Sequence, residues 1–176
     1  YRELIGVLSW VANICRPDIA YPVNVLSRYS CGPVTDGLVC GKEDLEVLRN
    51  YKRDRFSLVY STESNQEFNN VYRGLLKESQ EMGSYAVFSD ASFANCSVTL
   101  KSTSGSIVYF KGTPIWWRTQ RQTIRTYSTT EAEWVAASDT IVATEQLGFQ
   151  GFFQTGAEMS LTDSPVFVDN SSAIML

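Results

Sequence analysis

The chain has 176 residues, of which 44% are hydrophobic and 19% are charged. This length suffices for one well-buried domain with a small appendage. The apolar runs are interrupted within a few residues, so none can span a bilayer, and the start lacks a signal-peptide pattern. Histidine is absent and the four cysteines include no C-x-x-C pair. We therefore expect no zinc site, and we interpret the cysteines as small apolar residues in a reducing compartment.

The net charge of −4 hides an uneven distribution of charge along the chain. Residues 91–130 contain five basic residues and no acid, whereas residues 131–176 contain seven acids and no Lys or Arg. The first of these segments could meet a polyanion, and the second would repel one unless cations intervene. An ordinary solvated polar surface is the alternative that composition leaves open.

Residues 1–60 are predicted to form a small helical unit. Apolar residues at helical spacing run through 2–14, and two prolines suited to helix starts follow. A short charged helix is predicted over 42–53. Residues 61–83 are polar with weak periodicity, and we interpret them as a connector.

Residues 84–176 are predicted to form an α/β domain. The β-rich run SYAVFSD covers 84–90, and 104–126 is typical of two strands joined by a tight turn at Lys111-Gly112-Thr113. A long helix is predicted from just after Tyr127 to about Gln154. The strand SPVFVDN and the helix start SSAIML follow it. This order predicts a mixed sheet, with an antiparallel hairpin beside a parallel pair and helices flanking it.

Acidic residues end two of the predicted strands and begin the long helix. Asp90 and Asp169 close the runs SYAVFSD and SPVFVD, and ligand sites in open α/β sheets lie at the carboxyl ends of parallel strands. Carboxylates gathered there repel one another unless a divalent cation neutralises them, and Mg²⁺ prefers such oxygen ligands. Because Asp residues at strand ends also cap turns and helices, a structural role is the alternative.

Two glutamates lie two positions apart in the segment STTEAEW, residues 128–134. Neighbours at i and i+2 point to nearly opposite sides of a helix, so they cannot serve one site together. Ser128 and Glu131 match an S-x-x-E capping box, in which Glu131 reaches back to the N–H of the cap residue. Glu133 is then free to face the strand ends, and we expect it to be the third ligand. The alternative is a cap shifted by a residue through Thr129 or Thr130.

Several motifs resemble one known family. The segment LKSTSGSIVYFKGTPIWWRTQRQTIRTYSTTEAEWVAAS, residues 100–138, resembles the ribonuclease H domain of copia-type LTR-retrotransposon Pol polyproteins, which carries KSTSG, a PISW-like strand and SSTEAEY at this spacing. FSDASF resembles the family's YSDADW, and VDNSSAIML resembles its CDNQSAIAL. Residues 1–30 resemble the helical end of the adjoining reverse transcriptase, with its TRPDI and AVNLLSR motifs.

The resemblance implies a ribonuclease H-like fold that cuts the RNA strand of RNA–DNA hybrids with two Mg²⁺ or Mn²⁺ ions. The family's acids in these motifs fall on Asp90, Glu133 and Asp169, which are therefore the expected catalytic residues and metal ligands. The implied location is a cytoplasmic virus-like particle. The candidate nucleic-acid contacts lie in and near the basic stretch and are Lys101, Ser102, Thr103, Arg118, Arg121 and Arg125.

The sequence also departs from the family pattern. The family continues past SAIAL with another strand and a fourth Asp, whereas this chain stops at Leu176 and starts without Met. We therefore expect a piece of a longer polypeptide, with the C-terminal part of the fold truncated. Val142, Gly148 and Phe149 replace the Lys and the Arg pair that the family usually carries on the long helix. The polymerase aspartates are absent as well, so no polymerase activity is assigned.

Two functions remain open from the sequence. One is an active Mg²⁺-dependent endoribonuclease with the three acids as its centre. The other is a catalytically inactive, domesticated or truncated remnant that serves as a structural or interaction subunit of a larger assembly. Non-catalytic binding of a hybrid through residues 101–125 is a weaker third reading, because the acidic half of the domain would oppose it without metal.

Overall fold

A computed structural model describes residues 1–30, 58, 61–76, 85–155 and 164–174 of the chain. It divides into two compact units, Tyr1–Leu58 and Val59–Leu176, which are described separately below. The charged helix predicted over 42–53 lies outside the described residues. Within the described ranges, none of the helices combines the length and the apolar content that crossing a membrane requires.

The first unit contains two helices and a short 3₁₀ turn. Helix α1 covers Arg2–Ile14, as its apolar spacing predicted, η1 covers Pro17–Ile19 and α2 covers Ala20–Ser27. Pro17 suits the first position of η1 because a helix leaves the N–H of that residue unpaired in any case. The two helices bury a small apolar core made of Ala12, Ile19 and Val23, with Leu8, Val11 and Ala20 at its edge.

The second unit is built on a four-stranded mixed sheet with the order β3-β2-β1-β4. Strands β1 (Tyr85–Ser92), β2 (Thr103–Phe110) and β3 (Thr113–Arg121) are antiparallel neighbours, and β4 (Val166–Val168) pairs with β1 in parallel. Lys111 and Gly112, with φ of 46° and 77°, join β2 to β3. This left-handed pair suits the twist of a hairpin and explains the glycine.

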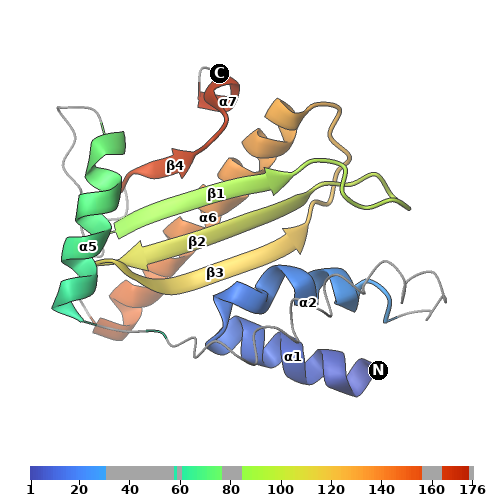
Figure 1. Cartoon of the computed structure of the whole chain (residues 1–176), viewed down its shortest axis with the longest axis horizontal. Coiled ribbons are helices and arrows are strands. Elements are labelled where there is room, and N and C mark those ends of the chain that lie inside the picture. The colour runs from blue at the N-terminus through green and yellow to red at the C-terminus, as the bar shows by residue number, and fades with distance from the viewer. Residues whose placement is uncertain (31–57, 59–60, 77–84, 156–163, 175–176) are drawn as a thin grey trace. The chain divides into compact units, whose positions relative to one another are not determined.

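Helix α6 (Thr129–Thr155) packs on one face of this sheet and lies behind it in Figure 1. Alternate residues of a strand point to opposite faces, so Val87 of β1 and Val108 of β2 face α6. Both have 0% exposure. The core that they form also contains Tyr85, with Phe110, Trp116 and Leu147 packed against it.

The opposite face of the sheet carries aromatic side chains that contact helix α5 (Thr62–Tyr72). The ring of Phe88 in β1 stacks on Phe167 in β4, with 4.7 Å between ring centroids and 16° between ring planes. Phe68 and Tyr72 of α5 contact the same group, which also includes Tyr109 of β2. The segment interpreted as a connector therefore contains a helix that packs on the sheet.

The order of elements in the second unit confirms the predicted mixed α/β fold. An antiparallel hairpin lies beside a parallel strand pair, helices flank the sheet, and the short helix α7 (Ser171–Ile174) follows β4. This arrangement is compatible with a ribonuclease H-like fold. It also brings the carboxyl ends of β1 and β4 together at one end of the sheet, because the two strands run in parallel.

Candidate metal centre

The two strand-end aspartates lie side by side. Ser89 of β1 pairs with Val168 of β4 in the parallel register, so the next residue on each strand brings Asp90 beside Asp169. Both side chains are exposed. Asp90 lies on the sheet face that carries Phe88 two residues earlier, since residues at i and i+2 of a strand share a face.

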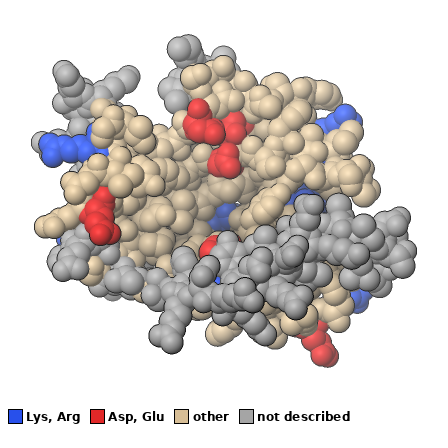
Figure 2. Space-filling model, in the orientation of Figure 1, with Lys and Arg blue, Asp and Glu red and all other residues tan. Residues whose placement is uncertain are grey.

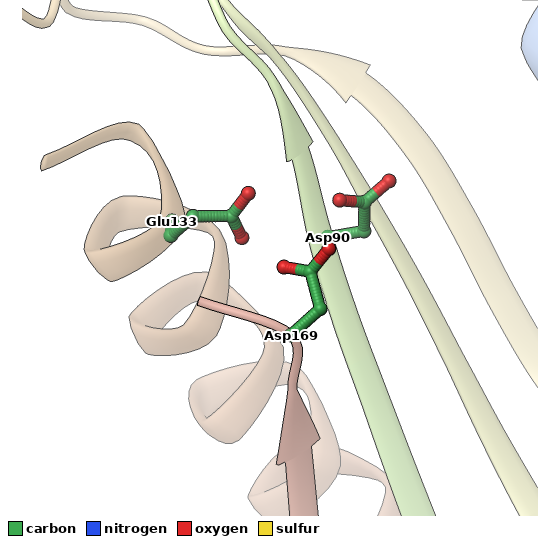
Figure 3. Close-up of side chains that lie close together, drawn as sticks. All are labelled: Asp90, Glu133 and Asp169. Atoms are coloured by element: carbon green, nitrogen blue, oxygen red, sulfur yellow. The ribbon is translucent and has the colours of Figure 1, made fainter. Parts of the chain in front are cut away.

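Glu133 reaches the aspartates from the beginning of α6 (Figure 3). Its side chain is buried, with 6% exposure, and its Oε1 accepts a hydrogen bond from the backbone N–H of Ala91 at 3.2 Å. One oxygen from each of Asp90, Glu133 and Asp169 lies within 4.8 Å of the other two. The structure therefore brings together the three carboxylates that the sequence had singled out, from two strands and one helix.

The pKa of Glu133 is raised to about 7, chiefly by burial and in smaller part by the nearby charges of Asp90 and Asp169, while the hydrogen bond from Ala91 opposes the shift. Its second oxygen, Oε2, is buried and has no hydrogen-bond partner among the described residues. A buried, unpaired carboxylate oxygen is costly, and a cation would satisfy it. Three carboxylate oxygens form a donor set that fits Mg²⁺ or Mn²⁺.

Glu131 has the structural role predicted for it. Its backbone N–H donates to Oγ of Ser128 at 3.1 Å, and its own Oε2 accepts from the N–H of Tyr127 at 2.7 Å. The capping box is thus confirmed, with one difference: the carboxylate bonds to the residue before the cap rather than to the cap itself. Glu131 therefore stabilises the start of α6, and Glu133, two residues later, points elsewhere.

Asn170 contributes to the site in a way that sequence analysis did not identify. Its Oδ1 accepts hydrogen bonds from the backbone N–H groups of Ser172 and Ala173, at 3.0 and 3.2 Å, and caps the start of α7. Because Asn170 directly follows Asp169, this cap fixes the backbone on the C-terminal side of that aspartate. The signal was present in the sequence as an Asn immediately before the predicted helix start.

The six candidate nucleic-acid contacts do not form a single surface. Arg118, Arg121 and Arg125 are exposed. Ser102 and Thr103 are buried, with 0% and 2% exposure. The Ser102 hydroxyl bonds to the Ala94 N–H and to the Thr126 hydroxyl, and the Thr103 hydroxyl bonds to Asn95. Both hydroxyl groups are therefore used in hydrogen bonds within the chain, and their contact with nucleic acid stays a prediction.

The remaining basic residues differ in their relation to the carboxylates. Arg121 pairs with Thr103 across β2 and β3, and Asp90 pairs with Gly105 on the same face of β2, so Arg121 shares the face of Asp90. Arg118, three residues earlier on β3, points to the other face. The Lys101 ammonium donates to the carbonyl of Thr123. In Figure 2, one group of acidic side chains lies near the top of the face shown, and other acidic side chains lie apart from it.

Comparison with known proteins relates the chain to retrotransposons. No protein-family model and no solved structure matches it. A Pol polyprotein from transposon RE1 of Arabidopsis thaliana is 30% identical over 100% of this chain, which covers 10% of that protein. The counterpart from transposon TNT 1-94 of Nicotiana tabacum is 29% identical over 100% of the chain and 12% of the polyprotein. A putative transposon Ty5-1 protein of Saccharomyces cerevisiae is 29% identical over 81% of the chain and 40% of that protein.

Pol polyproteins of Ty/copia-type retrotransposons are therefore homologues of this chain along its whole length. They support a retrotransposon-related function. The chain spans about a tenth of the length of the two plant polyproteins. A polyprotein carries several activities in different segments, so the activity of this segment is argued below from its own residues.

Proposed function

We propose that the chain is a ribonuclease H-type nuclease that hydrolyses the RNA strand of RNA–DNA hybrids with divalent cations. The observation that carries this proposal is the convergence of Asp90, Glu133 and Asp169, whose ligand oxygens lie within 4.8 Å of one another at the strand ends. The resemblance of the surrounding motifs to the retrotransposon ribonuclease H gives the reaction. The implied setting is the cytoplasmic virus-like particle of a retrotransposon.

The three carboxylates would have different roles at this site. Glu133 is held from the protein side, because Ala91 donates to its Oε1 and its Oε2 is buried beside the aspartates. Asp90 and Asp169 are exposed, so they can face both a cation and a phosphodiester from solvent. Bound Mg²⁺ or Mn²⁺ would supply the activation of a water molecule and the stabilisation of the leaving oxygen.

A cation accounts for this arrangement better than acid–base chemistry by the carboxylates alone. The pKa of Glu133 is about 7, raised first by burial and then by the two aspartates, so the free site is electrostatically unfavourable when all three groups are ionised. Pairing with a divalent cation removes that cost. The same cation would also let a polyanionic substrate approach an acidic region of the chain.

The substrate would approach along the face of the sheet that carries Asp90. Arg121 lies on this face, and Gly105, the direct partner of Asp90 on β2, leaves the sheet without a side chain there. A Cβ added at Gly105 would meet, among the described residues, only the carbonyl oxygen of Asp90 at 4.0 Å. Because packing does not require glycine at this position, close approach of a ligand to the backbone is the better explanation.

The proposal is tested by incubating the full chain with a labelled RNA–DNA hybrid in Mg²⁺ or Mn²⁺. We expect cleavage of the RNA strand, and we expect Asp90→Asn to abolish it. Asp139→Asn is the matched control, because Asp139 is an exposed aspartate of α6 that accepts a hydrogen bond from Gln120 at 3.2 Å. Absence of cleavage by the wild-type chain with either metal, and by a longer chain that continues past Leu176, would reject the enzymatic function.

A second candidate is an inactive remnant that acts as an interaction subunit, and one observation favours it. Helix α1 exposes a stripe of apolar side chains at helical spacing, with Val7 61% and Trp10 65% exposed between Leu4 and Ile14. Purification of the tagged chain in a stoichiometric complex that Trp10→Ser disrupts would support this role. A monomeric chain that cleaves the hybrid would argue against it.

A further inference from the structure

Gln122 is a buried polar side chain in the segment between β3 and α6. It is 2% exposed, and its Nε2 donates to Oγ of Ser104 at 3.0 Å and to the carbonyl oxygen of Ala132 at 2.9 Å. Its backbone N–H also donates to the carbonyl of Ser102 at 2.9 Å. One side chain thus connects β2 to the first turns of α6.

The contacts with Ser104 and Ala132 use both hydrogens of the Gln122 amide NH₂ group. The carbonyl of Ala132 can only accept a hydrogen bond, so the atom that faces it must be a donor. Because Ala132 lies within α6, its carbonyl already faces a donor of the helix, and Gln122 supplies a second one. The Oε1 of Gln122 is itself buried without a hydrogen-bond partner among the described residues. An unpaired buried acceptor lowers stability. Stability alone therefore does not explain a glutamine at this position.

The carbonyl that Gln122 holds belongs to the peptide group that links Ala132 to Glu133. The first turns of α6 are therefore fixed at two points, at β2 through Gln122 and at β1 through the hydrogen bond from Ala91 to Glu133. Buried Ala132 and Ala136 also pack the start of α6 onto the sheet, but Gln122 is the side chain that bonds to the peptide group of Glu133 itself, so its loss would leave the Glu133 carboxylate less firmly placed. A ligand held less firmly would adopt a wider range of positions.

We infer that Gln122 is a positioning residue for Glu133, acting through the Ala132 carbonyl, and that it sets the geometry of the carboxylate centre. This inference rests on the proposed function for its purpose, since the centre is the proposed metal site. Its geometry can be tested without metal, because the Ala91 N–H reports directly on the position of the Glu133 carboxylate.

The test compares Gln122→Met with two controls in the full chain. Methionine keeps the volume of glutamine and removes both side-chain hydrogen bonds. Gln120→Met makes the same change two residues earlier, where the amide bonds to exposed Asp139 in the middle of α6. Thr140→Val removes a buried hydroxyl that contacts Ser106 and the carbonyl of Ala136, and so lowers stability without touching the first turns of α6.

The first readout is the Ala91 amide resonance in ¹H–¹⁵N spectra of the metal-free protein. We expect Gln122→Met to move it toward its position in Glu133→Ala, and we expect both controls to leave it in place. The second readout is Mn²⁺ affinity, which should fall roughly tenfold in Gln122→Met, as for other residues that orient metal ligands. Thr140→Val should keep the wild-type affinity.

An unchanged Ala91 resonance in Gln122→Met, or an equal shift in Thr140→Val, would overturn the inference. If the wild-type chain binds no Mn²⁺ while the Ala91 resonance still moves in Gln122→Met, the metal centre is rejected and the positioning role is upheld. Should Gln122→Met not fold, Ser104→Ala removes only the bond that steadies the amide. Ser104→Ala should shift the Ala91 resonance in the same direction as Gln122→Met, but by a smaller amount. If the resonance does not shift in Ser104→Ala, the inference is rejected.

Discussion

Phe88 and Asp90 lie on the same face of β1, two residues apart, and their surroundings are opposite. Phe88 contacts four aromatic rings, from α5, β2 and β4. Asp90 has bare backbone beside it at Gly105 and two further carboxylates close by. Along about 7 Å of the strand, the sheet thus changes from a packed aromatic surface to a cluster of carboxylates that repel one another. This contrast fits our proposal, in which the aromatic end stabilises the fold and the carboxylate end binds a cation.

The largest effect is expected at the aromatic end. Phe88→Ala removes a ring that stacks on Phe167 at 4.7 Å and contacts both rings of α5, so it should lower the free energy of unfolding by roughly 3 kcal/mol. Chemical denaturation measures the loss. Phe93→Ala is the control, since Phe93 is 39% exposed just after the same strand, and its effect should be much smaller. Equal losses would remove the distinction between the two ends.

The carboxylate end should make stability depend on pH in the opposite sense from most acids. The pKa of Glu133 is about 7 in the folded protein, against 4.5 for an unperturbed glutamate. Between these values the folded state retains a proton that the unfolded state has released, so the free energy of unfolding falls as pH rises. Melting temperatures in EDTA across this range should show that decline in the wild type. It should be absent in Glu133→Gln.

Glu131→Gln provides the matched control for this pH dependence. Glu131 lies two residues away in the same helix turn but bonds to Tyr127 outside the carboxylate centre, so its variant should keep the wild-type slope. Mg²⁺ added above pH 7 should raise the melting temperature of the wild type, because the ion stabilises the ionised carboxylates. If the wild type and Glu133→Gln have the same slope, the pKa of Glu133 is not raised in the folded protein.

Local signals in the sequence were sufficient to predict most of the elements. The spacing of apolar residues gave helix α1 its observed bounds, and Lys111-Gly112 marked the hairpin turn. Helix α5 was missed because the aromatic residues through which it contacts the sheet, Phe68 and Tyr72, have partners that lie far along the chain. A polar segment with two aromatic residues gives little periodicity, although its packing is specific.

The carboxylate centre was predictable for a different reason. Acids that end parallel strands must meet at one edge of the sheet, and the capping box separated Glu131 from Glu133 by local geometry. The burial of individual polar residues, in contrast, could not be predicted from the sequence. Ser102 and Gln122 stand in polar, basic stretches that are typical of a surface, yet both are buried by contacts with distant residues.

A smaller effect is expected from removing one charge at the carboxylate end. Asp90→Asn takes away a carboxylate that repels Glu133. Asp90 is exposed, so water screens this repulsion, and two like charges about 5 Å apart in water repel each other by about 1 kcal/mol. The metal-free variant should therefore be more stable than the wild type by that amount at pH 8, while Mg²⁺ no longer stabilises it. Denaturation with and without Mg²⁺ measures both. A destabilised variant would mean that Asp90 has a structural role at this strand end.

The smallest effect on stability is expected at Gly105, which lies beside Asp90 and has no side chain to cover the sheet there. An added Cβ would meet only the Asp90 carbonyl at 4.0 Å among the described residues, so Gly105→Ala should fold and gain about 0.5 kcal/mol from reduced freedom of the unfolded chain. If the hybrid approaches this face, the methyl group should weaken its binding, and Gly105→Val should weaken it more. Fluorescence anisotropy with a labelled hybrid measures the affinity.

Gly74→Ala is the matched control for this last change. Gly74 lies in the short 3₁₀ helix η2 (Arg73–Leu75), and a Cβ there has no described neighbour within 4 Å. This variant should bind the hybrid as the wild type does. If Gly105→Val also binds the hybrid as the wild type does, the substrate does not bind at the sheet face that carries Asp90. The glycine at position 105 would then need another explanation. Weaker binding in Gly105→Val alone would locate the substrate on the face where the aromatic packing ends.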